Sequence, residues 1–214
     1  MIWVFCQQTQ VNSLCFINFS QRDSIGSAVY LELINGNREA AAARLRQLEP
    51  AMRKRAPDAI MYFANMVGDN ELAMEIVQEH LPELMNSESS EIDPGEAEHA
   101  VEVAQAFVVS GKLQQAQQLL KAALALMDGK PRNRGMNAYG QNDARAHALL
   151  GNTDAALTAL EEMVALEMLT SWESLRFDPA FDSLRDDLRF SAVLSQLEKL
   201  AEQKRQQAEQ EGLL

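Results

Sequence analysis

The stretch GNTDAALTALEEM, Gly151–Met163, contains a pattern from which the fold can be predicted. A glycine and a short polar turn precede an amphipathic helical pattern whose apolar stripe contains a small alanine. The same arrangement recurs after three earlier glycines: Gly36, Gly68 and Gly111. In every copy an alanine stands five residues after the glycine and an aliphatic residue stands nine after it: Ala41, Ala73, Ala116 and Ala156, then Leu45, Val77, Leu120 and Leu160. Four copies in register predict a repeated structural unit.

The physical reading of this unit is a pair of helices. Helical patterns also precede the glycines, as in AIMYFANMV before Gly68. The glycine supplies the left-handed backbone that ends a helix. An Asn or Asp follows every turn glycine except Gly111 and offers a capping oxygen for the next helix. Helices joined by so short a turn must approach closely, and the alanine permits that approach. Since one pair cannot bury its apolar face alone, we expect an all-α, right-handed α-solenoid of about four antiparallel helix pairs with a C-terminal helical cap.

This register resembles the tetratricopeptide repeat (TPR), whose period is about 34 residues. The resemblance covers roughly residues 25–167, where the turn glycines stand 32, 43 and 40 residues apart. The bulky aromatic and the early glycine of the family's first helix are mostly missing, and Met61, Ala104 and Ala144 occupy corresponding places. The long spacings predict inserted loops at residues 86–96 and 128–141.

The C-terminal part carries a second resemblance, in SWESLRFDPAFDSLRDDLRFSAVLSQLEKL after the last copy. It is similar to the tails of bacterial repeat domains attached to winged-helix transcriptional regulators, adenylate cyclases and protein kinases. Asp178-Pro179 and Asp186-Asp187 predict helix starts. A set of apolar residues is expected to cover the exposed edge of the last pair: Phe177, Phe181, Leu184, Leu188, Phe190, Leu194 and Leu197.

Three regions follow from these patterns. Residues 1–24 form an apolar N-terminal segment that fits a hairpin, an irregular cap or a disordered stretch equally well. Residues 25–167 contain the TPR-like repeats, and residues 168–214 contain the capping helices and a polar tail.

Composition limits the classes of function. The chain has 214 residues and a formal net charge of −12 at pH 7, which argues against a nucleic-acid partner. No run approaches the ~18–20 apolar residues of a membrane span, and the N-terminus lacks the basic start of a signal peptide. We therefore expect a cytoplasmic protein without a membrane span. The two cysteines, Cys6 and Cys15, are read as free thiols rather than a disulfide framework or metal site.

The sequence is poor in catalytic signals. Its three histidines, His80, His99 and His147, lack metal-ligand spacing. Four C-terminal carboxylates fit helix caps and surface ion pairs better than a metal or acid–base site: Asp178, Asp182, Asp186 and Asp187. There is no phosphate-binding loop, nucleophile elbow or kinase signature. We expect a non-enzyme without cofactor or metal.

The TPR resemblance implies a concave groove lined by the first helix of each pair. The residue six before each turn glycine would face this groove, which selects Tyr30, Tyr62, Gln105 and Arg145. Neighbouring positions three and ten before the glycine add Asp58, Asn65 and Gln141. Aromatic area with polar donors suits an extended peptide. In the alternative interpretation, the two tyrosines only fill space between helices.

These features predict a protein–protein interaction scaffold that binds a peptide or partner protein in its groove. The alternative is a sensory or regulatory module of a bacterial transcription regulator or signalling enzyme whose effector domain is absent from this chain. The sequence also leaves open whether the chain forms a homo-oligomer.

Overall fold

The computed structural model of the chain describes residues 23–48, 53, 56–85, 92, 97–128, 139–169 and 172–213. Every regular element within these ranges is a helix, so the predicted all-α class is confirmed for them. The α-helices are α1 (Asp23–Ile34), α2 (Arg38–Arg46), α4 (Pro57–Val67), α5 (Asn70–His80), α6 (Pro82–Met85), α7 (Ala97–Val109), α8 (Leu113–Met127), α9 (Tyr139–Leu149), α10 (Thr153–Ala165) and α11 (Leu188–Gln210). Two 3-10 helices, η2 (Trp172–Arg176) and η3 (Pro179–Leu184), precede α11.

Several predictions fall on residues outside these ranges. They are the structure of residues 1–22, with both cysteines, and most of the two predicted loops, at 86–91, 93–96 and 129–138.

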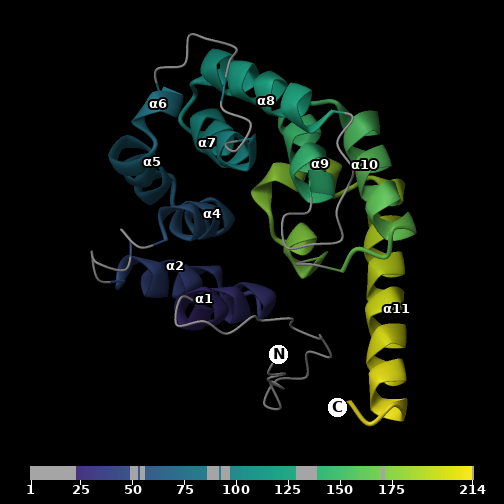
Figure 1. Ribbon diagram of the computed structural model, residues 1–214. Coiled ribbons are helices and arrows are strands. Elements are labelled where there is room, and N and C mark those ends of the chain that lie inside the picture. The colour runs from purple at the N-terminus through teal and green to yellow at the C-terminus, as the bar shows by residue number, and fades with distance from the viewer. Residues whose placement is uncertain are drawn as a thin grey trace.

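The helices are arranged as consecutive pairs, α1 with α2, α4 with α5, α7 with α8 and α9 with α10. The first helix of each pair contacts the first helix of the next, and each second helix except the last contacts the following first helix. Figure 1 shows the pairs following an arc, from α1 and α2 at the bottom, past α7 and α8 at the top, to α9 and α10 at the right. The helices α1, α4, α7 and α9 therefore form an inner layer.

The repeated turn is built as the sequence predicts. The four turn glycines have φ between 75° and 78°, and a Cβ at any of them would meet nothing within 4 Å. The glycine is therefore required by its backbone angle and not by a lack of space. The four alanines five residues later are at most 1% exposed. The capping prediction holds for Asp69, which accepts a hydrogen bond from the N–H of Leu72, but Asn37 and Asn152 make no side-chain cap.

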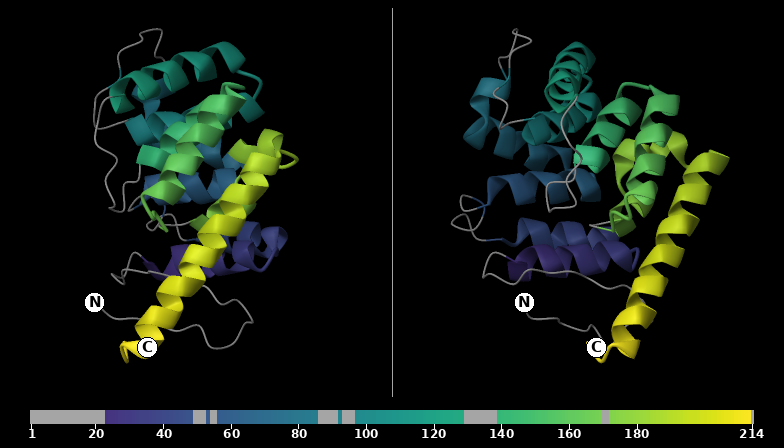
Figure 2. Two further views of the ribbon diagram at one scale, coloured as in Figure 1. Left: turned by 90° about the vertical axis from the view of Figure 1, so that its right-hand side faces the viewer. Right: turned by 45° about the vertical axis from the view of Figure 1, so that its right-hand side comes forward.

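The C-terminal segment enters the arc and then leaves it. After α10 the backbone of Glu167 is left-handed, with φ 53°, and the chain turns back towards the inner layer. Figure 1 shows η2 and η3 inside the arc, and Figure 2 shows α11 running along its outer side. The contacts agree, because η3 packs on α9 whereas α11 packs on α10.

The apolar residues of this segment cover α9 and α10 in part as predicted. Phe181, Leu184, Phe190 and Leu197 are buried in one cluster with residues of both helices, and Leu194 packs against it. The prediction was wrong for Leu188, which is 86% exposed. It lies two residues before Phe190 on α11, and a two-residue step along a helix leads to the opposite face.

Phe177 also departs from the prediction. Its ring packs edge-on against Tyr30 of α1, with 5.8 Å between the ring centroids, and not against the last pair. The C-terminal segment therefore reaches across the interior of the arc to the first helix pair.

Candidate functional site

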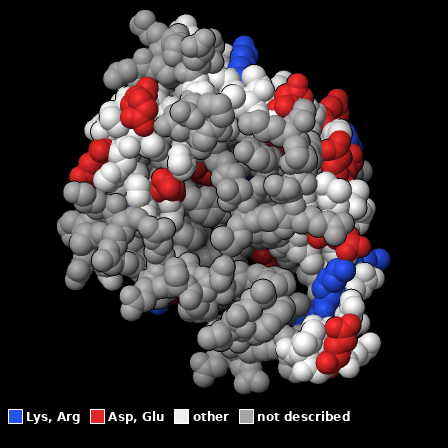
Figure 3. All heavy atoms as spheres, viewed as in Figure 1, with Lys and Arg blue, Asp and Glu red and all other residues white. Residues whose placement is uncertain are grey.

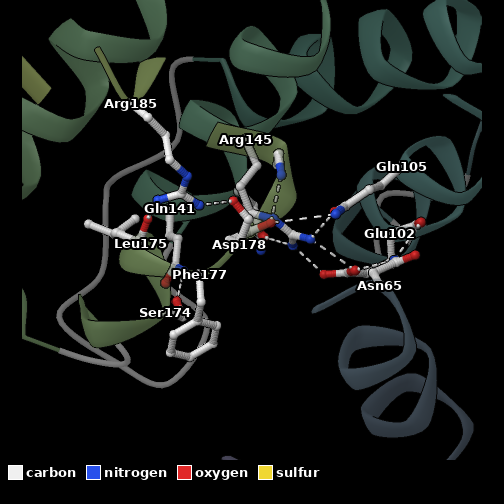
Figure 4. Close-up of polar contacts among 12 residues, drawn as sticks. Asn65, Glu102, Gln105, Gln141, Arg145, Ser174, Leu175, Phe177, Asp178 and Arg185 are labelled. Carbon is white, nitrogen blue, oxygen red and sulfur yellow. Dashed lines mark hydrogen bonds and ion pairs between the residues drawn. The ribbon is translucent and has the colours of Figure 1, made fainter. Parts of the chain in front are cut away.

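A buried polar network occupies the inner layer, with the guanidinium of Arg145 at its centre. Arg145 comes from α9 and is 1% exposed. It donates hydrogen bonds to both carboxylate oxygens of Glu102 and, at 2.6 Å, to Oε1 of Gln105, both on α7. On its other side Nε forms an ion pair with Oδ2 of Asp178 at 2.9 Å. Figure 4 shows this arrangement, with Asp178 on one side of Arg145 and the α7 residues on the other.

The network continues onto α4. The amide nitrogen of Asn65 donates to the backbone oxygen of Glu102 at 3.0 Å and to its Oε2 at 2.8 Å. The guanidinium carbon of Arg145 lies 5.7 Å from the ring centroid of Tyr62, within cation–π range. Three successive first helices, α4, α7 and α9, are thus joined by one set of side chains.

Burial and charge shift the titration of these groups. Burial alone would lower the pKa of Arg145, but the carboxylates of Asp178 and Glu102 raise it above its ordinary value. Burial raises the pKa of the Asp178 carboxyl, opposed by Arg145 and by the N–H of Ala180. Burial also raises the pKa of the Tyr62 hydroxyl, and the nearby Asp178 adds to this.

The partner of this inner face is the chain's own segment 172–178. Nε2 of Gln141 donates to the Ser174 hydroxyl at 2.7 Å, and Nε2 of Gln105 approaches Oδ1 of Asp178 at 3.5 Å. Asp178 is fully buried and also caps η3 by accepting from the N–H of Ala180. The prediction of a cap here is confirmed, but Asp178 is not part of a surface ion pair.

The first helix pair contacts the same segment through other residues, Glu173 and Phe177. The hydroxyl of Tyr30 donates to Oε2 of Glu173 at 3.3 Å. Arg38, at the start of α2, donates to the backbone oxygen of Phe177 at 2.9 Å. The segment therefore bridges the two ends of the arc.

The structure brings together all but one of the residues that the sequence selected for a groove. Tyr30, Tyr62, Asn65, Gln105, Gln141 and Arg145 all belong to the inner layer. Asn65 joins the others through Glu102, and the remaining five contact one another or segment 172–178. Asp58 does not join them. It lies in the first turn of α4 and is exposed, and its Oδ2 is 3.4 Å from Nε2 of His99. Whether this face binds a partner stays a prediction.

Sequence reasoning missed four members of the site. Glu102 stands three residues before Gln105 on α7 and so shares its face, a spacing that could have identified it. Glu173, Ser174 and Asp178 lie in the C-terminal segment, where no local pattern indicates that the chain returns to the first pair.

The remaining described surface offers no second centre of this kind. Within the described residues, no group of three or more His, Cys, Asp or Glu could hold a metal ion, and no helix is long and apolar enough to span a membrane. On the face shown in Figure 3, acidic side chains are scattered, and the largest group of basic side chains lies at the lower right, over α11. No protein-family model, curated protein or solved structure matches the chain.

Proposed function

We propose that the chain is a non-catalytic protein-interaction scaffold, a TPR-like, right-handed solenoid of about four helix pairs that binds a protein segment on its inner layer. One observation carries the proposal. Side chains from α1, α7 and α9 contact a short stretch of polypeptide, η2 and the two residues after it (172–178), through its side chains. A face that holds one short segment in this way has the donors, the aromatic area and the concave placement that a second segment would need.

The test compares full-length baits whose inner face is open or closed. Glu173→Ala/Phe177→Ala removes two side chains by which the chain's own segment contacts Tyr30. We expect this open bait to retain a partner protein from the source cell more strongly than the wild type does. Adding Tyr62→Ala to the open bait should reduce the retention, because Tyr62 lies against Arg145 in the inner layer.

Leu188→Ala is the matched control, since this exposed side chain lies outside the inner layer. The proposal fails if the open and wild-type baits retain the same proteins in the same amounts, or if Tyr62→Ala has no effect on what the open bait retains.

A further inference from the structure

The segment in the inner layer presents a defined order of side chains. Glu173 meets Tyr30, Ser174 meets Gln141, Phe177 packs on Tyr30, and Asp178 meets Arg145 and Gln105. Acidic, hydroxyl, aromatic and acidic side chains thus occupy the first, second, fifth and sixth places of a six-residue stretch.

The backbone of this stretch is held mainly from within the C-terminal unit. The guanidinium of Arg185 donates to three backbone oxygens of the segment, those of Leu175 at 3.3 Å, Arg176 at 2.6 Å and Asp178 at 3.0 Å. Figure 4 shows Arg185 reaching these carbonyls from the side away from Glu102. By contrast, the residues of the inner layer contact mainly the side chains of the segment. Arg38, at the start of α2, adds one hydrogen bond to the backbone oxygen of Phe177. A segment of another protein that is followed by a similarly placed arginine could therefore adopt the same backbone conformation.

We propose that segment 172–178 is an internal ligand and that the partner of this face carries a stretch of the same chemistry: an acidic residue followed by Ser, then an aromatic residue and Asp at the fifth and sixth places. This inference rests on the function proposed above. It adds the class of partner and the way in which the chain's own segment regulates binding of that partner. The partner competes with the chain's own segment, so the wild-type chain is closed until that segment is displaced.

Tethering sets how strongly the chain's own segment competes. The segment is joined to α10 by a short connection, so its effective concentration at the inner layer reaches the millimolar range or above. A free peptide of equal intrinsic affinity therefore binds the wild-type chain far more weakly than a chain whose own segment has lost part of its contacts, such as those of Glu173 and Phe177 with Tyr30.

The experiment measures a labelled synthetic peptide with the sequence of residues 172–185 by fluorescence anisotropy. The titrated proteins are the full wild-type chain, the open variant Glu173→Ala/Phe177→Ala and the control Leu188→Ala. We expect the open variant to bind the peptide roughly a hundredfold more tightly than the other two chains do. Peptides carrying Phe177→Ala or Asp178→Asn should lose roughly tenfold or more in affinity for the open variant.

Two results overturn the inference. One is equal binding of the peptide to the open and wild-type chains, which places its site elsewhere. The other is no binding to an open variant that retains its helical circular dichroism. If the double variant does not fold, Glu173→Ala alone replaces it under the same criteria.

The failure of this inference differs from the failure of the proposed function. A partner retained by the open bait that the peptide does not compete away would overturn the chemistry of the segment and leave the scaffold function standing. No Tyr62-dependent retention at all would overturn the function.

Discussion

Arg145 is the residue on which the interior depends most. It is fully buried against two carboxylates, Glu102 and Asp178, and an isolated charge in such a place is strongly unfavourable. Buried ion pairs contribute little net stability compared with apolar replacements, but removing one member leaves the others uncompensated. The network therefore fixes the register of the C-terminal segment on α7 and α9 more than it adds to the free energy of unfolding.

Replacing Arg145 with Met should be severely destabilising. Two carboxylates would lose their buried counter-charge, and we expect a loss of ~3–5 kcal/mol in the free energy of unfolding by urea. Arg189→Met is the matched control, because Arg189 pairs with Glu161 and Asp154 at the surface. An equal effect of the two substitutions would show that the buried network does not contribute in this way.

Asp178→Asn should change how stability depends on pH. The raised pKa of Asp178 means that the folded chain binds a proton at this carboxyl more readily than the unfolded chain does. Its contribution to stability is then complete below the unfolded pKa of about 3.9 and is lost as pH rises through the higher folded pKa. The variant, which cannot titrate there, should lose less stability than the wild type between pH 4 and the folded pKa.

Urea unfolding at a series of pH values measures this difference, with the exposed Asp182→Asn as control. A variant whose pH profile runs parallel to that of the wild type would contradict the raised pKa.

At the scale of the element, the helix pair depends on a small residue at its closest approach. Ala116 on α8 is 1% exposed, whereas Ala125 on the same helix faces solvent. We expect Ala116→Leu to lower the free energy of unfolding by ~1–3 kcal/mol, because the added atoms overpack the contact with α7. Ala125→Leu should leave thermal unfolding nearly unchanged. An unaltered midpoint for Ala116→Leu would show that the alanine does not limit helix approach.

The sequence allowed the pair to be predicted because its signals are local. A turn glycine, an alanine five residues later and an aliphatic residue nine later constrain each helix end and its buried stripe. Counting back six residues from Gly111 and Gly151 also found Gln105 and Arg145, since helical periodicity fixes the face. Asp178 returns to that face through a contact with Arg145, which is 33 residues away in the sequence. No local sequence pattern indicates a contact of this kind. Leu188 was assigned to the core because hydrophobicity alone does not set the face of α11.

At the scale of the whole molecule, the C-terminal unit completes both the core and the inner layer. Phe181, Phe190 and Leu197 cover apolar residues of α9 and α10, while segment 172–178 fills the interior. Such a unit is required because the end of a helical stack is an exposed apolar surface.

A chain truncated before Ser174 should aggregate. The truncation uncovers buried residues such as Ala156 and Leu160. It also removes Asp178, whose carboxylate is a counter-charge of the buried Arg145. Size-exclusion chromatography with light scattering measures the result, with a chain ending at residue 202 as control, because that chain retains every buried residue of α11. If the chain truncated before Ser174 is a monodisperse monomer with an unchanged thermal midpoint, the role given to this unit is contradicted.

The bridge between the first and last parts of the chain also bears on how the protein is made. Tyr30 and Glu173 are 143 residues apart, and Arg38 and Phe177 are 139 apart. At a synthesis rate of ~5–20 residues per second, Glu173 and Phe177 are added to the chain roughly 10–30 s after α1. Local helix pairs form far sooner than this. The residues of α1 that contact segment 172–178 are therefore without these partners until that segment has been synthesised, and we expect the arc to close late in folding.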